Sequence, residues 1–155
     1  MINKMTPQRY NTHNCIENCI ANYCDAVGVD FKPMFLYSWD FGYDESRTTV
    51  GERLHYHHSC SMNFENYIQL SERYLNISFK PEMIDGNILK HKYEEGSVFV
   101  ISTDSFECPW NLAYQKYHYP HYYLLISNHD HPEKYWVAID SFSTLEIVNM
   151  DSNIL

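Results

Sequence analysis

The chain has 155 residues, of which 45% are hydrophobic and 20% are charged, which fits one globular domain over residues 1–155 with a core of its own. Its 20 acidic and 11 basic side chains give a formal net charge of −9. This balance argues against nucleic acid or an anionic membrane surface as a partner, because both attract lysine and arginine. No apolar run is long enough for a transmembrane helix, and the first ten residues lack the apolar stretch of a signal peptide. We therefore expect a cytoplasmic protein with reduced cysteines.

The first half of the chain carries helical patterns. Apolar side chains recur at helical spacing over residues 15–27, and Gly28 is placed to end that helix. Residues 30–44 are aromatic and interrupted by Pro33, which predicts a loop with one helical turn. A second helix is expected over residues 62–75, with four buried side chains: Phe64, Tyr67, Ile68 and Leu75.

The second half changes to strand patterns after two short elements. Residues 76–80 predict a short strand, and Asp85 is placed to cap a third helix that runs to Glu95. Apolar runs then predict four strands, over residues 97–103, 121–127, 134–140 and 145–150. The polar stretch 128–133 supplies the turn between the second and third of these strands. Helices followed by an antiparallel sheet favour an α+β fold.

Cys15 is the best candidate for a reactive thiol among the five cysteines. It lies at the start of the first predicted helix, where free N–H groups and the helix dipole favour the thiolate. It falls at the edge of the buried stripe, whereas Cys19 and Cys24 lie within the stripe, where a thiol behaves as a small hydrophobic group. The competing interpretation is that Cys15 is another core cysteine.

A nucleophilic cysteine needs a base, and the base needs an orienting group. His121 opens one predicted strand, and Asp140 ends the next. If the two strands form a hairpin, these residues lie across from each other and can form a hydrogen bond. The competing interpretation is a strand-edge histidine and a turn-opening aspartate. With Cys15, the chain order cysteine, histidine, aspartate is the papain-like arrangement.

Other chemistries receive less support from the sequence. The histidine-rich stretches 55–60 and 129–131 are dense clusters without the second spaced pair that is usual in a zinc site, so solvated loops are the favoured interpretation. No two carboxylates are paired by spacing, and no glycine-rich loop could hold a nucleotide phosphate. We therefore expect no metal and no bound cofactor.

Several stretches together resemble a known family. These are "HNCIENCIANYC" (13–24), "FLYSWDFGYD" (35–44), "STDSFECPWNLAYQKYHYPHYYLLIS" (102–127) and "YWVAIDSF" (135–142). They are similar to the N-terminal family of butirosin biosynthesis protein H, and the similarity spans roughly residues 10 to 143. The third stretch is the most specific part of the resemblance.

The resemblance implies a papain-like fold, with N-terminal helices packed on an antiparallel β-sheet, and a cysteine-dependent acyltransferase or hydrolase. In such enzymes a cysteine takes an acyl or aminoacyl group from the thioester of a phosphopantetheinyl carrier protein and passes it to a small amine, in nonribosomal peptide or antibiotic biosynthesis. The implied partners are therefore an acyl or peptidyl carrier protein and the amine acceptor. Carried over by position, Cys15 is the nucleophile, His121 the base and Asp140 the orienting acid.

The donor to the oxyanion is left open by the sequence. Exporter peptidases that resemble this fold place a glutamine where this chain has Arg9. The side-chain candidates are Gln8, Asn11 and Asn14, beside the backbone N–H of Cys15.

The base and acid also have alternatives. His118 stands three residues before His121 and is a second candidate for the base or for substrate contact. Asp104 and Glu107 are reserve candidates for the acid. Aromatic side chains are expected to wall the acyl cleft: Trp39, Phe41, Tyr43, Trp110, Tyr114 and Tyr117.

Two other functions compete with acyl transfer. The same residues could form a cysteine peptidase related to the leader peptidases of bacteriocin exporters. Alternatively, the chain could be a catalytically silent docking domain of an assembly-line protein. Since butirosin-type proteins usually continue into a second domain, this chain could be a stand-alone variant or one domain of a larger protein.

Overall fold

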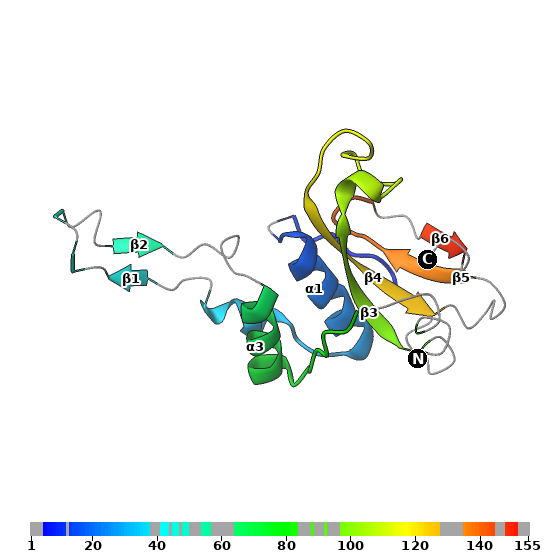
Figure 1. Ribbon diagram of the computed structural model, residues 1–155. Coiled ribbons are helices and arrows are strands. Elements are labelled where there is room, and N and C mark those ends of the chain that lie inside the picture. The colour runs from blue at the N-terminus through cyan, green and yellow to red at the C-terminus, as the bar shows by residue number, and fades with distance from the viewer. Residues whose placement is uncertain are drawn as a thin grey trace. The chain divides into compact units, whose positions relative to one another are not determined.

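The computed structural model describes residues 5–11, 13–37, 41–43, 45–46, 48–49, 54–56, 64–83, 88, 92, 97–127, 135–144 and 148–151 (Figure 1). The chain forms two compact units, one made of Met1–Gly28 with Glu82–Leu155 and the other of Val29–Pro81. The single domain over residues 1–155 stays a prediction.

The larger unit contains a four-stranded antiparallel sheet in which each strand pairs with the next one along the chain. Its elements are helix α1 (Cys15–Val27), strand β3 (Val98–Asp104), the 3-10 helix η3 (Ser105–Glu107), and strands β4 (Pro120–Ser127), β5 (Tyr135–Ile139) and β6 (Val148–Asp151). Each of the four predicted strands is present within three residues of its expected ends, and the mixed α+β class is confirmed. The expected turn at 128–133 lies outside the described residues.

Apolar side chains cover both faces of this sheet, which explains why β4 is almost continuously apolar. One cluster joins the sheet to α1: Met5, Cys19, Leu124, Ile126 and Ile139. The other covers the opposite face: Cys108, Tyr123, Leu125, Trp136 and Ala138. Burying a leucine of this kind contributes roughly 2 kcal/mol to folding, so these clusters supply most of the driving force for the unit.

Helix α1 begins and ends where the sequence predicts. Asn14 and Glu17 form a capping box: the Asn14 side chain accepts from the Glu17 N–H at 3.0 Å, and Glu17 Oε2 accepts from the Asn14 N–H at 2.9 Å. Gly28 ends the helix in the left-handed conformation, with φ of 74°. Both ends therefore satisfy backbone groups that the helix itself leaves unpaired.

The chain before α1 runs back along the helix and is held by two asparagines. Asn22 accepts from the Gln8 N–H at 2.8 Å and donates to the Gln8 carbonyl at 2.9 Å. Asn18 accepts from the Tyr10 N–H at 3.0 Å and lies 3.4 Å from the Tyr10 carbonyl. Gln8 and Tyr10 are two residues apart, a distance of roughly 6.6 Å in extended chain, which is close to the rise of about 5.4 Å for the helical turn between Asn18 and Asn22. The two asparagine side chains therefore bind the backbone of this segment.

The smaller unit contains the 3-10 helix η1 (Lys32–Tyr37), the antiparallel strands β1 (Phe41–Tyr43) and β2 (Leu54–Tyr56), and helix α3 (Phe64–Leu75). Helix η1 is the helical turn expected in the aromatic loop. The second predicted helix is present from its third expected residue, with Tyr67 and Leu75 buried as predicted. Phe64 and Ile68 are half-buried, and Ser71 is buried instead.

The strand predicted over residues 76–80 is wrong. Asn76 adopts a left-handed conformation with φ of 55°, and the Ile77 N–H donates to the Ser71 carbonyl at 3.2 Å. The chain thus leaves α3 through a left-handed residue, and residues 76–80 form no strand. Of the third predicted helix, Ile88 and Lys92 are helical, while Asp85 and Glu95 lie outside the described part of the chain.

Across the described ranges, no helix has both the length and the apolar character that crossing a bilayer requires.

The cap of α1 gives a direct stability test. Gly28→Ala should lower the free energy of unfolding by about 1 kcal/mol, because alanine tolerates the left-handed conformation poorly. No atom lies within 4 Å of a β-carbon added at Gly28, so the effect is conformational and not a clash. Urea unfolding measures it, and Gly28→Asn is the matched control because asparagine accepts this conformation. Equal losses in both variants would show that the cap conformation is not the cause.

Candidate active site

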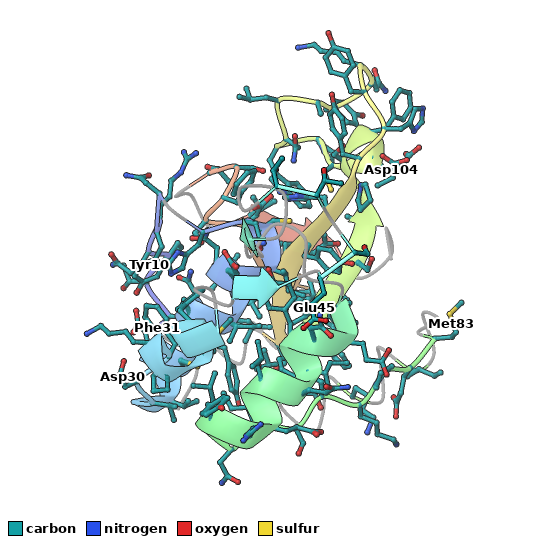
Figure 2. All side chains as sticks on the ribbon, turned by 90° about the vertical axis from the view of Figure 1, so that its left-hand side faces the viewer. Tyr10, Asp30, Phe31, Glu45, Met83 and Asp104 are labelled. Carbon is teal, nitrogen blue, oxygen red and sulfur yellow. The ribbon has the colours of Figure 1, made fainter. Side chains whose placement is uncertain are left out.

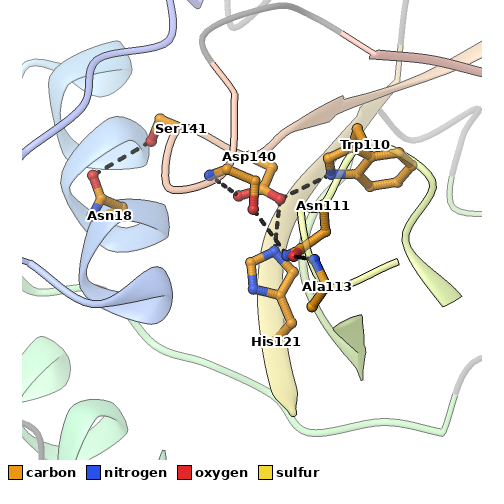
Figure 3. A network of polar contacts seen from close by, with 8 residues as sticks. Asn18, Trp110, Asn111, Ala113, His121, Asp140 and Ser141 are labelled. Carbon is orange, nitrogen blue, oxygen red and sulfur yellow. Dashed lines mark hydrogen bonds and ion pairs between the residues drawn. The ribbon is translucent and has the colours of Figure 1, made fainter. Parts of the chain in front are cut away.

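His121 and Asp140 form a buried hydrogen-bonded pair at one end of the sheet (Figure 3). His121 Nε2 lies 2.6 Å from Asp140 Oδ2, and the two residues are 3% and 2% exposed. In the β4–β5 register Leu124 faces Ile139, so continuing the pairing places Asp140 diagonally from His121. Diagonal neighbours in a sheet are within reach of long side chains. The predicted contact between these two residues is present.

The carboxylate of Asp140 is held by three donors. Besides His121, the Trp110 Nε1–H donates to Oδ2 at 2.8 Å and the Ser143 N–H donates to Oδ1 at 3.1 Å. Burial works to raise the pKa of Asp140, but the hydrogen bond and charge of His121 and the bonds from Trp110 and Ser143 outweigh it. The pKa of Asp140 is therefore lowered, and the group is a carboxylate at neutral pH.

Cys15, in the first turn of α1, interacts with the same histidine. Burial works to lower the pKa of His121, yet hydrogen bonds with Asp140 and Cys15, and the charges of both, raise it to about 9. With Nε2 occupied by Asp140, Nδ1 is the ring nitrogen left for the sulfur. A pKa of about 9 makes His121 mainly protonated at neutral pH, and the ring lies between the Asp140 carboxylate and the half-buried Cys15.

The other described cysteines lie in a different environment. Cys19, Cys24 and Cys108 are buried free thiols. Burial raises the pKa of Cys19 well above its ordinary value, and the charges of Cys15 and Asp140 raise it further. Burial, with the charge of Asp140, also raises the pKa of Cys108 to about 11. The thiols of Cys19 and Cys108 therefore resist ionisation, as expected for core cysteines.

The alternative base, His118, belongs to a separate and exposed pair. His118 Nδ1 lies 2.7 Å from Asp104 Oδ2, and the two side chains are 69% and 40% exposed. The ring of His118 also stacks on Phe106 at 4.3 Å between centroids. Asp104, at the end of β3 (Figure 2), has its pKa lowered by the Phe106 N–H and by His118. The structure thus joins Asp104 to His118 and Asp140 to His121, while Glu107 is exposed.

The oxyanion candidates occupy different places. The side-chain oxygen of Asn14 caps α1, the backbone of Gln8 is bound to Asn22, and Asn11 is exposed. Among the aromatic candidates, Trp110 is half-buried with its N–H on Asp140, Tyr114 is half-buried, and Tyr117 is exposed. Trp39 and the side chains of Phe41 and Tyr43 lie outside the described residues.

The sequence analysis did not predict a buried polar cluster beside Asp140, which consists of Ser141, Asn18 and Asn22. Ser141 Oγ accepts from Asn22 Nδ2 at 2.8 Å and lies 3.5 Å from Asn18 Oδ1. All three residues are buried. The signal was present in the sequence, since Asn14, Asn18 and Asn22 recur at every fourth position along one side of the predicted helix.

Metal ligands do not gather in the part of the chain that the structure describes, where no group of three histidine, cysteine or acidic side chains could hold an ion. The side chains of 55–60 and 129–131 lie outside that part.

No family model, curated protein or solved structure matches this chain.

The raised pKa of His121 makes stability depend on pH. The folded-state pKa is about 9 and the ordinary value is 6.5, so protonated His121 stabilises the fold below pH 6.5, and this contribution is lost as pH rises through 9. We expect the free energy of unfolding to fall by about 2 kcal/mol between pH 6 and pH 8. Urea unfolding across this range measures the free energy of unfolding. In His121→Gln, its decrease between pH 6 and pH 8 should be smaller than in the wild type by about 2 kcal/mol. An identical pH dependence in both proteins would contradict the assignment.

Proposed function

We propose that the larger unit is a cysteine acyltransferase or hydrolase of the papain-like kind, with Cys15 as nucleophile, His121 as base and Asp140 as orienting acid. The observation that carries the proposal is the environment of His121, which is buried, bonded through Nε2 to Asp140, and raised in pKa to about 9 by interactions that include Cys15. An imidazolium beside a cysteine favours the thiolate, which is the reactive form.

In the first half of the proposed reaction an acyl-enzyme forms. The Cys15 thiolate attacks the carbonyl carbon of a thioester, and collapse of the tetrahedral intermediate breaks the carbon–sulfur bond to the carrier. The imidazolium of His121 gives its proton to the departing sulfur, so the carrier leaves as a thiol. The N–H of Cys15 lies in the first turn of α1, where backbone N–H groups lack partners within the helix, and serves as an oxyanion donor.

In the second half the acyl group moves to the acceptor. An amine attacks the acyl carbon, and neutral His121 takes the proton from the attacking nitrogen. The bond to the Cys15 sulfur then breaks, which releases the amide and restores thiolate and imidazolium. Water in place of the amine gives hydrolysis by the same steps. Asp140 stays ionised throughout and holds Nε2, which leaves Nδ1 directed to the reaction.

The family resemblance supplies three parts of this proposal: the carrier-bound thioester, the amine acceptor, and the setting in antibiotic or nonribosomal peptide assembly. The chemistry of the site agrees with such a substrate, because a thioester expels a thiol, a far better leaving group than the amine of a peptide. Free thiols at the four described cysteines agree with a cytoplasmic location, which is part of the proposal.

Turnover of matched substrates tests the proposal. An acyl-pantetheine thioester should release free thiol in the presence of an amine, and a peptide with the same acyl residue should not be cleaved. Cys15→Ser should lower the rate by about a thousandfold or more, because the hydroxyl is not ionised by an imidazolium. Cys24→Ala, which removes a buried thiol from the same helix, is the matched control and should keep the rate.

Two outcomes would contradict the proposal. Cleavage of the peptide at least as fast as thioester turnover would assign a peptidase. No turnover of either substrate by the folded wild-type protein would favour a silent docking domain.

A further inference from the structure

A buried serine joins the helix that carries Cys15 to the turn that carries Asp140. Ser141 follows Asp140 directly, and its hydroxyl faces Asn18 of α1 (Figure 3). The hydroxyl oxygen accepts from Asn22 Nδ2 at 2.8 Å and lies 3.5 Å from Asn18 Oδ1. It thus contacts two side chains one helical turn apart on the same element.

These two asparagines cannot turn away from the serine without losing other bonds. Besides Ser141 Oγ, the Asn22 Nδ2 group has two further acceptors within reach, the carbonyls of Gln8 and Asn18, and its two hydrogens are shared among these three oxygens. The Asn22 Oδ1 atom accepts from the Gln8 N–H. The Asn18 amide donates to the carbonyls of His13 and Asn14, each at 3.0 Å. Because every polar atom of both side chains is engaged, the asparagines form a fixed surface on α1.

The turn on the other side of Ser141 is equally constrained. The carbonyl of Asp140 accepts from the N–H groups of Ser143 at 3.1 Å and Thr144 at 2.8 Å. The side chain of Asp140 accepts from the Ser143 N–H as well. A shift of Ser141 relative to α1 would therefore move Asp140 and, through it, His121.

Next to the polar contact at Ser141, α1 also packs on the sheet through apolar side chains. Cys19 packs against Leu124 and Ile126 in a cluster whose buried members are apolar. Apolar contacts are non-directional and permit small sliding, whereas a hydrogen bond weakens steeply when its geometry changes.

We propose that Ser141 is a positioning residue, through which Asn18 and Asn22 fix the placement of Cys15 relative to the His121–Asp140 pair. The inference rests on the proposed function, since it assigns Ser141 a role in that reaction. Ser141 acts through Asp140 and α1 and does not touch the substrate.

Alkylation of Cys15 tests this role with the intact chain. Iodoacetamide labelling is followed by peptide mass mapping from pH 6 to pH 10. In Ser141→Ala, labelling of Cys15 should be about tenfold slower than in wild type at pH 6 to 7, because a misplaced imidazolium no longer supports the thiolate. Near pH 10 the two rates should converge, because free cysteine thiols in general are mostly ionised at that pH. Ser141→Thr keeps the hydroxyl and should recover most of the rate.

Ser105→Ala is the matched control. Ser105 is buried in the same unit, and its hydroxyl accepts from the Tyr119 N–H at 3.1 Å and lies 3.3 Å from the Tyr117 carbonyl. This variant loses an equivalent buried hydroxyl away from Cys15, so it should label Cys15 at the wild-type rate. Equal slowing in Ser105→Ala and Ser141→Ala would overturn the proposal, because loss of any buried hydroxyl would then suffice.

The outcomes separate this inference from the proposed function. If wild-type Cys15 labels no faster than N-acetylcysteine at pH 6, the proposed function fails. If wild-type Cys15 is fast and Ser141→Ala matches it at every pH, the positioning role fails and the proposed function stands. If Ser141→Ala does not fold, Ser141→Cys, of similar size with a weak acceptor, takes its place. Failure of both to fold would overturn the inference, since the hydroxyl would then be a folding requirement.

Discussion

The hydrogen bond between His121 and Asp140 is the interaction on which the site depends. Both partners are almost inaccessible to solvent, and removing two ionised groups from water costs several kcal/mol for each. Three N–H donors at the carboxylate and two partners at the imidazolium offset that cost. Loss of one partner would leave the other charge buried and uncompensated. The two charges are therefore stable in the interior only as a pair, and in the proposed function the pair supports the Cys15 sulfur.

Segments far apart in the sequence converge on the turn after β5. Helix α1 contacts this turn through the bond from Asn22 to Ser141. The connection between β3 and β4 contacts it through Trp110, which donates to Asp140, and through Asn111, whose Nδ2 donates to Ser143 Oγ at 3.0 Å (Figure 3). That connection is closed at its base by the Ser105 N–H, which donates to the Tyr119 carbonyl at 2.9 Å. The Asp140 carboxylate is thus held from two sides. In the proposed reaction, preorganisation of this kind would avoid rearrangement.

The elements that could be predicted from the sequence are those with strong local signals. Helix α1 has apolar periodicity and a glycine stop, and both act as expected, whereas the capping role of Asn14 was not predicted. The contact between His121 and Asp140 followed from hairpin geometry, because antiparallel pairing brings the start of one strand to the end of the next. The strand predicted over 76–80 failed because its apolar residues follow an asparagine that ends α3 in a left-handed turn.

The features that apolar periodicity and local motifs did not reveal depend on tertiary packing. Apolar periodicity identifies only buried hydrophobic residues, so it did not predict that Asn18 and Asn22 are buried beside them. The sequence also has no local signal for the different partners of the two histidines. His118 pairs with Asp104 at the surface and His121 pairs with Asp140 in the interior, although the two histidines are only three residues apart in the same aromatic stretch. The approach of Cys15 to His121 requires α1 to pack on β4, which no spacing within either element encodes.

The most direct test of the account is a titration of the His121 ring by NMR in the wild-type protein and in Cys15→Ala. The account predicts a pKa of about 9 in the wild type, and a lower pKa in Cys15→Ala because the sulfur no longer supports the imidazolium. Cys24→Ala, on the same helix, should leave the titration of His121 unchanged. A wild-type pKa at or below 6.5, or a value that does not respond to Cys15→Ala, would contradict the coupling of thiol, imidazole and carboxylate on which the account is built.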